Sequence, residues 1–310
     1  MKILLTGGTG FIGSELLKTL SSHQILLLTR NIEAAKKNLS FVDLGNIQYL
    51  DDLSSLQDLN DIDAVINLAG EPIADKRWSA AQKKAICDSR WQVTEALVEL
   101  IHASAKPPAV FISGSAVGYY GDQQAHPFDE CLHVHSAGFT HTVCAHWEQI
   151  AKRAQSDLTR VCLLRTGVVL APHGGALKKM LLPYQFGLGG PIGSGKQYLP
   201  WIHLQDMVRA IVFLLETPHA QGEYNVCAPH PVSNKEFSRA LAKSLHRPHF
   251  LWTPKWVMTL MMGESSCLLF DSIRAKPKRL TELGFTFHFS RIEPALNHLL
   301  KAKHWLSSVY

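Results

Sequence analysis

The sequence predicts an α/β protein with a doubly wound parallel sheet and a smaller α/β part at its C-terminal end. Short, nearly continuous apolar runs such as ILLL and AVINL alternate with amphipathic stretches through the first half of the chain. Runs of this kind are typical of parallel strands buried on both faces. A glycine-rich turn, TGGTGFIG, separates the first apolar run from the first amphipathic stretch. Together these features favour consecutive right-handed strand–helix–strand units.

In the first half, strands and helices are expected in alternation. The apolar runs predict strands over residues 1–6, 24–29, 63–68, 109–113 and 160–164. The amphipathic stretches predict helices over residues 13–20, 79–103 and 143–154.

After Gly167 the pattern changes. Residues 171–200 are rich in glycine and proline and predict no regular element. Helices are expected again over residues 206–216, over 234–245 with Asn234 as the N-cap, and near 292–301. We therefore place the boundary between the cofactor-binding part and the substrate-side part near residue 165, within one compact molecule.

The composition is that of a globular protein with one large domain, alone or with a smaller appendage. The chain has 310 residues, of which 46% are hydrophobic and 18% charged. The opening MKILLTGG is too short an apolar run for a signal peptide, and no window reaches the roughly 18 apolar residues of a membrane span. We therefore expect no membrane partner. Six scattered cysteines form no Cys-x-x-Cys pair, so we expect a cytoplasmic protein.

The charge does not predict a nucleic-acid partner. The formal net charge of +5 is mild, and no run of five basic residues occurs. A few basic residues gathered around an anionic cofactor would account for the excess equally well. We expect a small-molecule substrate, and the sequence carries no signal for the oligomeric state.

The glycine-rich turn predicts a dinucleotide site. Gly7, Gly10 and Gly13 are spaced three apart, directly after a strand and at the start of a helix. The first allows a tight turn, the second lets the backbone approach a pyrophosphate, and the third permits close helix–strand packing. The helix N-terminus adds free N–H donors. The alternative is a turn that serves packing alone. The expected cofactor contacts here are Gly7, Thr9, Gly10, Phe11, Ile12 and Gly13.

Three-apart glycines resemble the short-chain dehydrogenase/reductase superfamily, and the form TGGTGFIG resembles its extended branch of sugar-nucleotide epimerases and dehydratases. NLAG and WIHLQD are similar to further segments of that branch. AGEPIADKRWSAAQKKAICDSR, RTGVVLAPHGGALKKM and the tail segment KPKRL resemble one subgroup, labelled "epimerase family protein" or "nucleoside-diphosphate-sugar epimerase". The resemblance covers essentially the whole chain. It implies an NAD(P)-binding Rossmann domain over residues 1–165 and an interleaved substrate-side subdomain over 166–310.

The end of the second predicted strand favours NADP(H). Where an acidic residue commonly accepts hydrogen bonds from the adenosine ribose, this chain has Thr29 and Arg30, and Arg30 can pair with a 2′-phosphate. The alternative is a solvated arginine. Asp51 follows a further strand, expected between the strands over 24–29 and 63–68, and could meet the adenine edge, although Asp52 stands beside it. The resemblance implies further cofactor contacts from Asn67, Leu68, Ala69, Gly70, Arg90 and Val169.

The superfamily's catalytic Tyr-x-x-x-Lys pair is absent. In the extended branch a Glu often stands four residues after the Lys, and counting back from Glu148 puts Cys144 at the Lys position and Thr140 at the Tyr position. Thr is too weak an acid near neutral pH, and a Cys thiol carries no positive charge. No Tyr-x-x-x-Lys occurs elsewhere in the sequence. The usual route of proton transfer is therefore not expected.

The segment ISGSAVGYYGD holds the remaining candidates for catalysis. Ser115 resembles the serine that hydrogen-bonds the substrate oxygen in the superfamily. Tyr119 and Tyr120 offer phenols near the carboxyl end of the sheet, where ligands bind in such folds. Our hypothesis is that one of these tyrosines delivers the proton; the alternative is that both pack against the pocket wall.

Three basic residues are candidates for substrate binding. Arg165 could pair with an anionic group or anchor the strand end, and His203 is expected on the same side of the cleft. Lys196 lies in GPIGSGKQ, which nearly matches the phosphate-binding loop of nucleoside triphosphatases but has Gln197 in place of Ser or Thr. We interpret that segment as a substrate-covering loop.

No metal site is predicted. Residues of metal-binding types crowd one short stretch, but their spacing matches no common zinc pattern. They are Cys131, His133, His135, His141, Cys144 and His146.

Two functions remain open. The first is an NADP(H)-dependent oxidoreductase or epimerase-like enzyme acting on a small polar substrate, with nucleotide-linked substrates as one option. The second is a catalytically silent NADP(H)-binding sensor or regulator. The sequence leaves open whether the protein turns over at all.

Overall fold

The structure, a computed structural model, describes residues 1–39, 44–134 and 136–301. In these ranges seven strands form one sheet in the order β11-β7-β5-β4-β1-β2-β3, and all neighbouring pairs are parallel. This confirms the predicted doubly wound α/β fold. The strands are β1 (Lys2–Thr6), β2 (Gln24–Leu28), β3 (Ile47–Leu50), β4 (Ala64–Asn67), β5 (Val110–Ala116), β7 (Arg160–Thr166) and β11 (Gly222–Val226).

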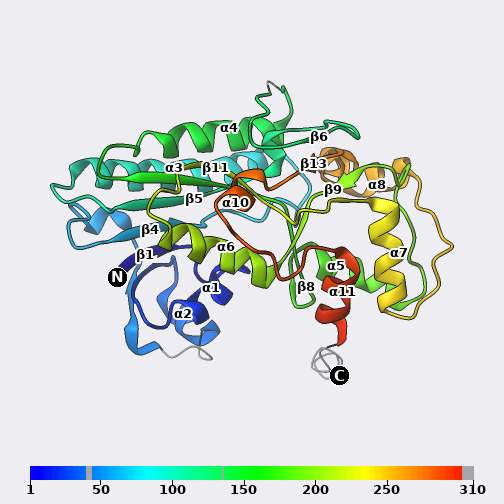
Figure 1. Ribbon diagram of the computed structural model, residues 1–310, viewed down its shortest axis with the longest axis horizontal. Helices are drawn as coiled ribbons and strands as arrows, with labels where there is room; N and C mark the ends of the chain where they lie inside the picture. The colour runs from blue at the N-terminus through cyan, green and yellow to red at the C-terminus, as the bar shows by residue number, and fades with distance from the viewer. Residues whose placement is uncertain (40–43, 135, 302–310) are drawn as a thin grey trace.

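Alternation along β1 explains why the sheet is covered on both faces. Ile3 and Leu5 belong to the apolar cluster that includes helices α1 and α6, whereas Leu4 belongs to the cluster that includes α3 and α4. Figure 1 shows α3 and α4 above the sheet, and α1, α2 and α6 below it. The covering helices are α1 (Gly13–Thr19), α2 (Ile32–Asn38), α3 (Ala80–Ala103), α4 (Phe139–Lys152) and α6 (Leu204–Glu216). Burial of both faces is what the unbroken apolar runs require.

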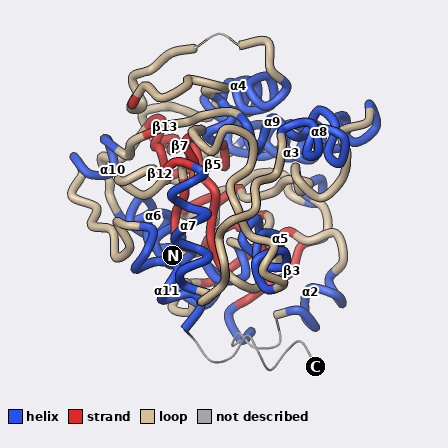
Figure 2. The backbone as a smooth tube through the Cα atoms, turned by 90° about the vertical axis from the view of Figure 1, so that its right-hand side faces the viewer, coloured by secondary structure: helices blue, strands red, loops and turns tan. Residues whose placement is uncertain are grey.

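Most of the remaining elements form a lobe beyond the carboxyl ends of the strands, whereas α10 packs against β11. Figure 1 shows α5, α7, α8 and α11 at the side of the molecule opposite to the N terminus, and Figure 2 views this side face on. Short strand pairs, β8 with β10, β9 with β12 and β6 with β13, connect the lobe to the sheet. Their bounds are Val168–Ala171, Trp201–His203, Tyr198–Leu199, Val232–Ser233, Pro127–Phe128 and Arg274–Ala275. The helices are α5 (Gly175–Gln185), α7 (Asn234–Ser244), α8 (Lys255–Met262), α9 (Cys267–Phe270), α10 (Lys278–Glu282) and α11 (Ile292–Lys301).

The second half of the chain contributes to both parts. Residue 165 lies within β7, and β11 and α6 from beyond it complete the sheet and one of its covering layers.

Helix α5 was not predicted. No regular element was expected over residues 171–200, because this window combines the helix with the glycine-rich loop that follows it. Leu177, Leu181 and Tyr184 are buried at helical spacing, and Pro183 falls in the last turn. Periodicity within a shorter window would have shown the helix.

The start of α4 and the N-cap of α7 also differ from prediction. Helix α4 begins at Phe139 because its N-cap, Gly138, offers no side-chain signal in the sequence. The N-cap of α7 is Ser233, which forms a capping box with Glu236. Asn234, predicted as the cap, instead accepts a hydrogen bond from the Ile192 backbone N–H at 2.8 Å.

The first turn of α6 anchors the segment that precedes α11. The Asp206 side chain is completely buried and accepts hydrogen bonds from the backbone N–H groups of His288, at 3.0 Å, and Phe289, at 2.8 Å. Arg209 donates to the same carboxylate at 2.8 Å. One side chain therefore satisfies two backbone donors that would otherwise be buried without partners.

We expect Asp206→Ala to lower the free energy of unfolding by about 3–5 kcal/mol, because it leaves two backbone N–H donors and the Arg209 charge without a partner. Glu293→Ala is the matched control, because its ion pair with Lys243 is exposed and an exposed pair contributes below about 1 kcal/mol. Urea denaturation at neutral pH measures both. Equal losses in the two variants would contradict the anchoring role.

Candidate functional site

The glycine turn leaves space for a pyrophosphate. Gly7 has φ +69°, and a Cβ there would lie 2.5 Å from the Leu68 carbonyl oxygen. A Cβ at Gly13 would lie 2.3 Å from the Gly7 oxygen, and one at Gly10 3.1 Å from the same atom. Ile12, the N-cap of α1, provides no side-chain cap for the first-turn N–H groups. The residues present therefore fit a phosphate group at this turn.

The end of β4 lies against this turn. Thr6 Oγ1 donates to Asn67 Oδ1 at 2.6 Å, and Asn67 Nδ2 donates to Thr94 Oγ1 at 2.8 Å. The Ala69 N–H donates to Thr6 Oγ1 at 3.2 Å. These buried bonds hold β1, β4 and α3 together, so the predicted segment from Asn67 to Gly70 lies beside Gly7.

Arg90 secures the far end of the same segment. A Cβ at Gly70 would lie 2.9 Å from Arg90 Cζ, so the guanidinium packs directly on this glycine. Arg90 Nη1 donates to the carbonyls of Glu71, at 3.1 Å, and Ile86, at 2.9 Å. Burial lowers the pKa of Arg90. The side chain thus fixes the loop next to the expected cofactor position, as well as placing a cation there.

The adenosine end is set by the pairing of β2 with β3. The Thr29 N–H donates to the Leu50 carbonyl at 2.8 Å, which brings Arg30 and Asp51 to the same edge of the sheet. Arg30 is exposed, and its side chain has no hydrogen bond or ion pair to another residue in the described ranges. Asp52 accepts a bond from the Ser54 N–H at 2.9 Å, which leaves Asp51 as the acidic side chain available to an adenine.

A buried ion pair lies beneath the expected substrate position. Arg165 Nε and Nη2 donate to Glu148 Oε1 and Oε2, both at 2.8 Å, and each side chain is only 2% exposed. Ser115 Oγ donates to Glu148 Oε1 at 2.7 Å. Of the two roles considered for Arg165, the geometry matches the anchor at the strand end. The guanidinium nitrogens Nε and Nη2 donate to Glu148 and are not directed to a ligand.

The two candidate tyrosines have different surroundings. Tyr120 is completely buried; its hydroxyl donates to Asn225 Oδ1 at 2.8 Å and accepts from Arg165 Nη1 at 2.9 Å. Burial raises the pKa of the Tyr120 phenol. Tyr119 is partly buried, its ring centroid lies 3.7 Å from Arg165 Cζ, and its hydroxyl has no partner among the described residues. Tyr119 is therefore the better placed of the two to exchange a proton.

The positions of the missing pair lie on the inner face of α4. Thr140, Cys144 and Glu148 are spaced four apart and are all buried. Burial raises the pKa of the Cys144 thiol to about 12, so the thiol remains uncharged near neutral pH. Neither Thr140 nor Cys144 supplies the charge that a lysine would place there.

His203 does not face a substrate cleft. Its ring is 2% exposed and stacks on Phe289 with centroids 3.9 Å apart. Nδ1 accepts from the Gln205 N–H at 3.0 Å, and Nε2 lies 3.1 Å from Nδ1 of His298 on α11. Burial lowers the pKa of His203 to about 4, so the ring is neutral. With both nitrogens engaged, this residue caps α6 and holds the C-terminal helix, contrary to expectation.

The other two candidates lie apart from the ion pair. Val169 is 8% exposed and pairs with Ile202 between β8 and β10. Lys196 is exposed in the glycine loop that precedes β9, where its N–H donates to Ser194 Oγ at 3.2 Å. Neither contacts Ser115 or Tyr119.

The described ranges contain neither a metal-binding cluster nor a membrane-spanning helix. His, Cys, Asp and Glu side chains there form no group that could hold a metal ion. Of the crowded metal-type residues, His135 lies outside the described ranges, and His141 contacts the Tyr119 carbonyl. No described helix combines the length and apolar character needed to cross a membrane.

The sequence missed the function of Glu148, which served only as a marker for counting. Two oppositely charged residues, one on an expected helix and one at the end of the next strand, were the available signal. Their pairing depends on which face α4 turns to the sheet, and this became visible only in the structure.

The chain is similar to several proteins over nearly its whole length and nearly theirs. It is 38% identical over 304 residues to an epimerase family protein of Staphylococcus haemolyticus, covering 97% of this chain and 99% of that protein. It is 36% identical over 301 residues to one of Staphylococcus aureus strain N315, covering 96% and 98%. A crystal structure of a human epimerase family protein with NADPH superposes with a TM-score of 0.88 at 32% identity, covering 97% of this chain and 100% of that one.

Family profiles match both parts of the chain. Residues 3–227 match the NAD dependent epimerase/dehydratase family, and residues 253–299 match a domain of unknown function, DUF1731. A UDP-glucuronic acid 4-epimerase from Bacillus cereus, at 18% identity and a TM-score of 0.77, shares the fold. The glycine turn, the parallel sheet and the full-length relatives agree: this chain belongs to the NAD dependent epimerase/dehydratase family, with an additional C-terminal domain.

Proposed function

We propose that the protein binds NADPH and acts as an oxidoreductase on a small substrate. The observation that carries the cofactor assignment is the exposed Arg30 at the end of β2, whose side chain has no partner among the described residues and could pair with a 2′-phosphate. The human relative crystallised with NADPH supports it. Bound NADPH would supply a hydride, and the pyrophosphate would lie on the turn from Gly7 to Gly13.

Ser115 would hold the substrate oxygen. Its hydroxyl hydrogen is directed to Glu148, but Arg165 already donates to both oxygens of that carboxylate. Rotation of the Ser115 hydroxyl towards a substrate carbonyl therefore leaves no oxygen of Glu148 unpaired. Ser115 can bind either an alcohol or a carbonyl at this position.

Tyr119 would exchange the proton with the substrate oxygen. Its hydroxyl is free of partners in the described ranges, and the Arg165 guanidinium faces its ring at 3.7 Å. In this proposal Arg165 on β7, although paired with Glu148, takes the part that a lysine has in the superfamily.

A second function, a silent NADPH-binding sensor, is favoured by one observation. By the count from Glu148, Thr140 and Cys144 stand in place of the catalytic pair, and neither is a proton donor near neutral pH. A sensor would bind NADPH without turnover, and its affinity for a partner protein would change with the redox state of the cofactor.

Cofactor preference tests the first part of the proposal. We expect at least tenfold tighter binding of NADPH than of NADH at low salt, because a charge-assisted contact contributes about 1.5–3 kcal/mol. Arg30→Asp should invert the preference, and the preference should shrink with added salt. Titration calorimetry with both cofactors measures this. Arg239→Asp, an exposed arginine on α7, is the control and should leave the preference unchanged. Equal affinities in the unmodified protein would refute the assignment.

The two tyrosines test the second part. Tyr119→Phe should lower kcat for NADPH oxidation with carbonyl substrates by about 10²–10⁴-fold and leave NADPH affinity unchanged. Tyr120→Phe should mainly lower the free energy of unfolding, because Asn225 and Arg165 lose a buried partner. Unchanged turnover in Tyr119→Phe would exclude it as the proton donor. Absence of turnover in the unmodified protein, with NADPH bound, would favour the sensor.

A further inference from the structure

Tyr119 lies at the end of a short turn whose last carbonyl is held by a side chain. The 3₁₀ turn Val117–Tyr119 follows β5 directly. Its first two carbonyls accept hydrogen bonds from backbone N–H groups beyond the turn, at 3.0 and 3.3 Å. The carbonyl at the end of such a turn lacks a backbone donor. Among the described residues, the Tyr119 carbonyl has its polar contact with Nδ1 of His141, in the first turn of α4.

This contact determines which nitrogen of the His141 ring carries a hydrogen. A carbonyl oxygen only accepts, so Nδ1 must donate. Nδ1 carries a hydrogen in one neutral tautomer and also in the charged ring, so the bond can form in either state. Nε2 has no partner in the part of the chain that the structure describes. The polar contact of this half-buried ring is therefore directed at Tyr119.

The start of α4 lies directly against the turn. A Cβ added at Gly118 would lie 3.1 Å from Cβ of Thr140, the residue before His141. Gly138, the N-cap of α4, makes no side-chain hydrogen bond. Close packing and the His141 bond are therefore what hold the first turn of α4 to the segment that carries Tyr119.

Three side chains enclose the Tyr119 ring. Arg165 Cζ lies 3.7 Å from the ring centroid, and the Tyr120 ring meets it edge-on with centroids 5.3 Å apart. The His141 ring lies 5.2 Å away, tilted by 45°. Arg165 and Tyr120 belong to the buried network at the ends of β5 and β7, whereas His141 approaches from α4. His141 thus contacts both the main chain and the ring of Tyr119.

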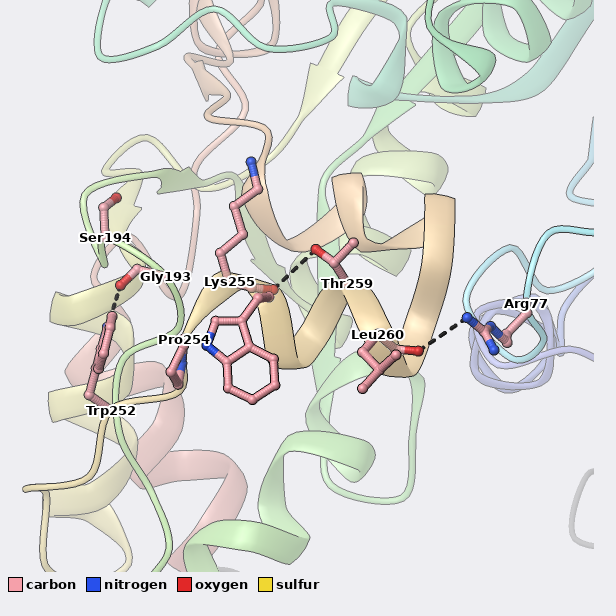
Figure 3. Close-up of a pocket in the computed structure, with 9 residues that line it drawn as sticks. Arg77, Gly193, Ser194, Trp252, Pro254, Lys255, Thr259 and Leu260 are labelled. Atoms are coloured by element: carbon pink, nitrogen blue, oxygen red, sulfur yellow. Dashed lines mark hydrogen bonds between the residues drawn. The ribbon is translucent and has the colours of Figure 1, made fainter.

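The open groove along α8 lies apart from these contacts. Figure 3 shows the residues that line it, with Arg77 and Lys255 on different sides of the helix. Neither Tyr119 nor His141 is among the lining residues. The side chains around the phenol come instead from the sheet and from a helix that covers it.

We propose that His141 is a positioning residue for Tyr119. Its Nδ1 hydrogen bond fixes the main chain at the end of the turn, and with it the place of the phenol hydroxyl relative to Ser115. A proton donor must lie within about 2.6–3.2 Å of the oxygen that it serves, and a misplacement of about 1 Å can cost about 10²-fold in rate. The catalytic part of this inference rests on the proposed function, whereas the fixing of Tyr119 does not.

Two amide variants separate the hydrogen bond from other effects of the side chain. The amide nitrogen of Asn stands as far from Cβ as Nδ1 of His does, whereas the amide nitrogen of Gln corresponds to Nε2. His141→Asn therefore keeps a donor for the Tyr119 carbonyl, and His141→Gln and His141→Ala do not. Gln has a higher helix propensity than Asn, so a role in helix stability alone would favour the Gln variant.

Carbon-13 NMR of the full chain with tyrosine labelled at Cζ tests the positioning without turnover. Tyr119→Phe assigns the Tyr119 signal by its loss. Removal of the imidazole ring moves this signal in every His141 variant, so its width and multiplicity decide. We expect one narrow signal in the unmodified chain and in His141→Asn, and a broadened or split signal in His141→Ala and His141→Gln.

His146→Ala is the matched control. His146 is an exposed histidine on the same helix, and its ring meets Trp91, with centroids 4.5 Å apart, instead of Tyr119. This variant should leave the Tyr119 signal and the turnover unchanged.

Turnover tests the catalytic part. His141→Ala and His141→Gln should lower kcat for reduction of carbonyl substrates by about 10–10²-fold and leave NADPH affinity within about twofold. His141→Asn should retain kcat within about threefold. Because His141 acts through Tyr119, adding His141→Ala to Tyr119→Phe should cause no further loss of rate.

Three results would overturn the inference. These are a single narrow Tyr119 signal in all three variants, a broadened signal in His141→Asn as well, or a loss of rate from His141→Ala that persists in the Tyr119→Phe background. Failure of the proposed function has a different signature. If Tyr119→Phe turns over like the unmodified chain, or the chain binds NADPH without turnover, the catalytic part falls with the proposed function. The NMR signals then decide by themselves whether His141 fixes Tyr119.

Discussion

The buried ion pair between Arg165 and Glu148 is the interaction on which the centre of this molecule depends. It joins the end of β7 to α4 through two parallel hydrogen bonds, with both side chains 2% exposed. Removal of one partner from such a pair typically costs about 3–5 kcal/mol, because the other charge stays buried without compensation. Through Tyr120 and Asn225 the pair also reaches β11, so the last strand of the sheet depends on it.

The same pair determines what chemistry the site can support. Glu148 fixes Ser115 and occupies the fork of Arg165, while the flat face of the guanidinium lies over Tyr119. The family's fold and phosphate turn are kept, but the positions where the superfamily has its Tyr and Lys are filled by buried, uncharged side chains. In the proposed mechanism Arg165 on β7, paired with Glu148, is the basic residue next to Tyr119.

The features that could be predicted were those set by residues close together in the sequence. Apolar runs, helical periodicity and the three-apart glycines predicted the sheet, its covering helices and the phosphate turn, and the last helix has the bounds expected, Ile292–Lys301. Side-chain partners far apart in sequence could not be predicted. His203 meets His298, 95 residues away, and Arg77 meets Leu260, 183 residues away. The exposure of α8 could not be predicted either, because none of its residues is buried among the described residues although its sequence, KWVMTLMM, is apolar.

A crystal structure with NADPH bound would show the distances from nicotinamide C4 to the hydroxyl oxygens of Ser115 and Tyr119, and so whether these two residues can act on a substrate. We expect both hydroxyls to face the reacting edge of the nicotinamide, with a substrate-sized space between them, and a substrate oxygen placed there to lie within about 3.2 Å of each. We also expect Arg165 to remain paired with Glu148 in the complex. A complex in which Arg165 leaves Glu148 for a ligand, or in which Tyr119 turns away from the nicotinamide, would contradict the proposed mechanism.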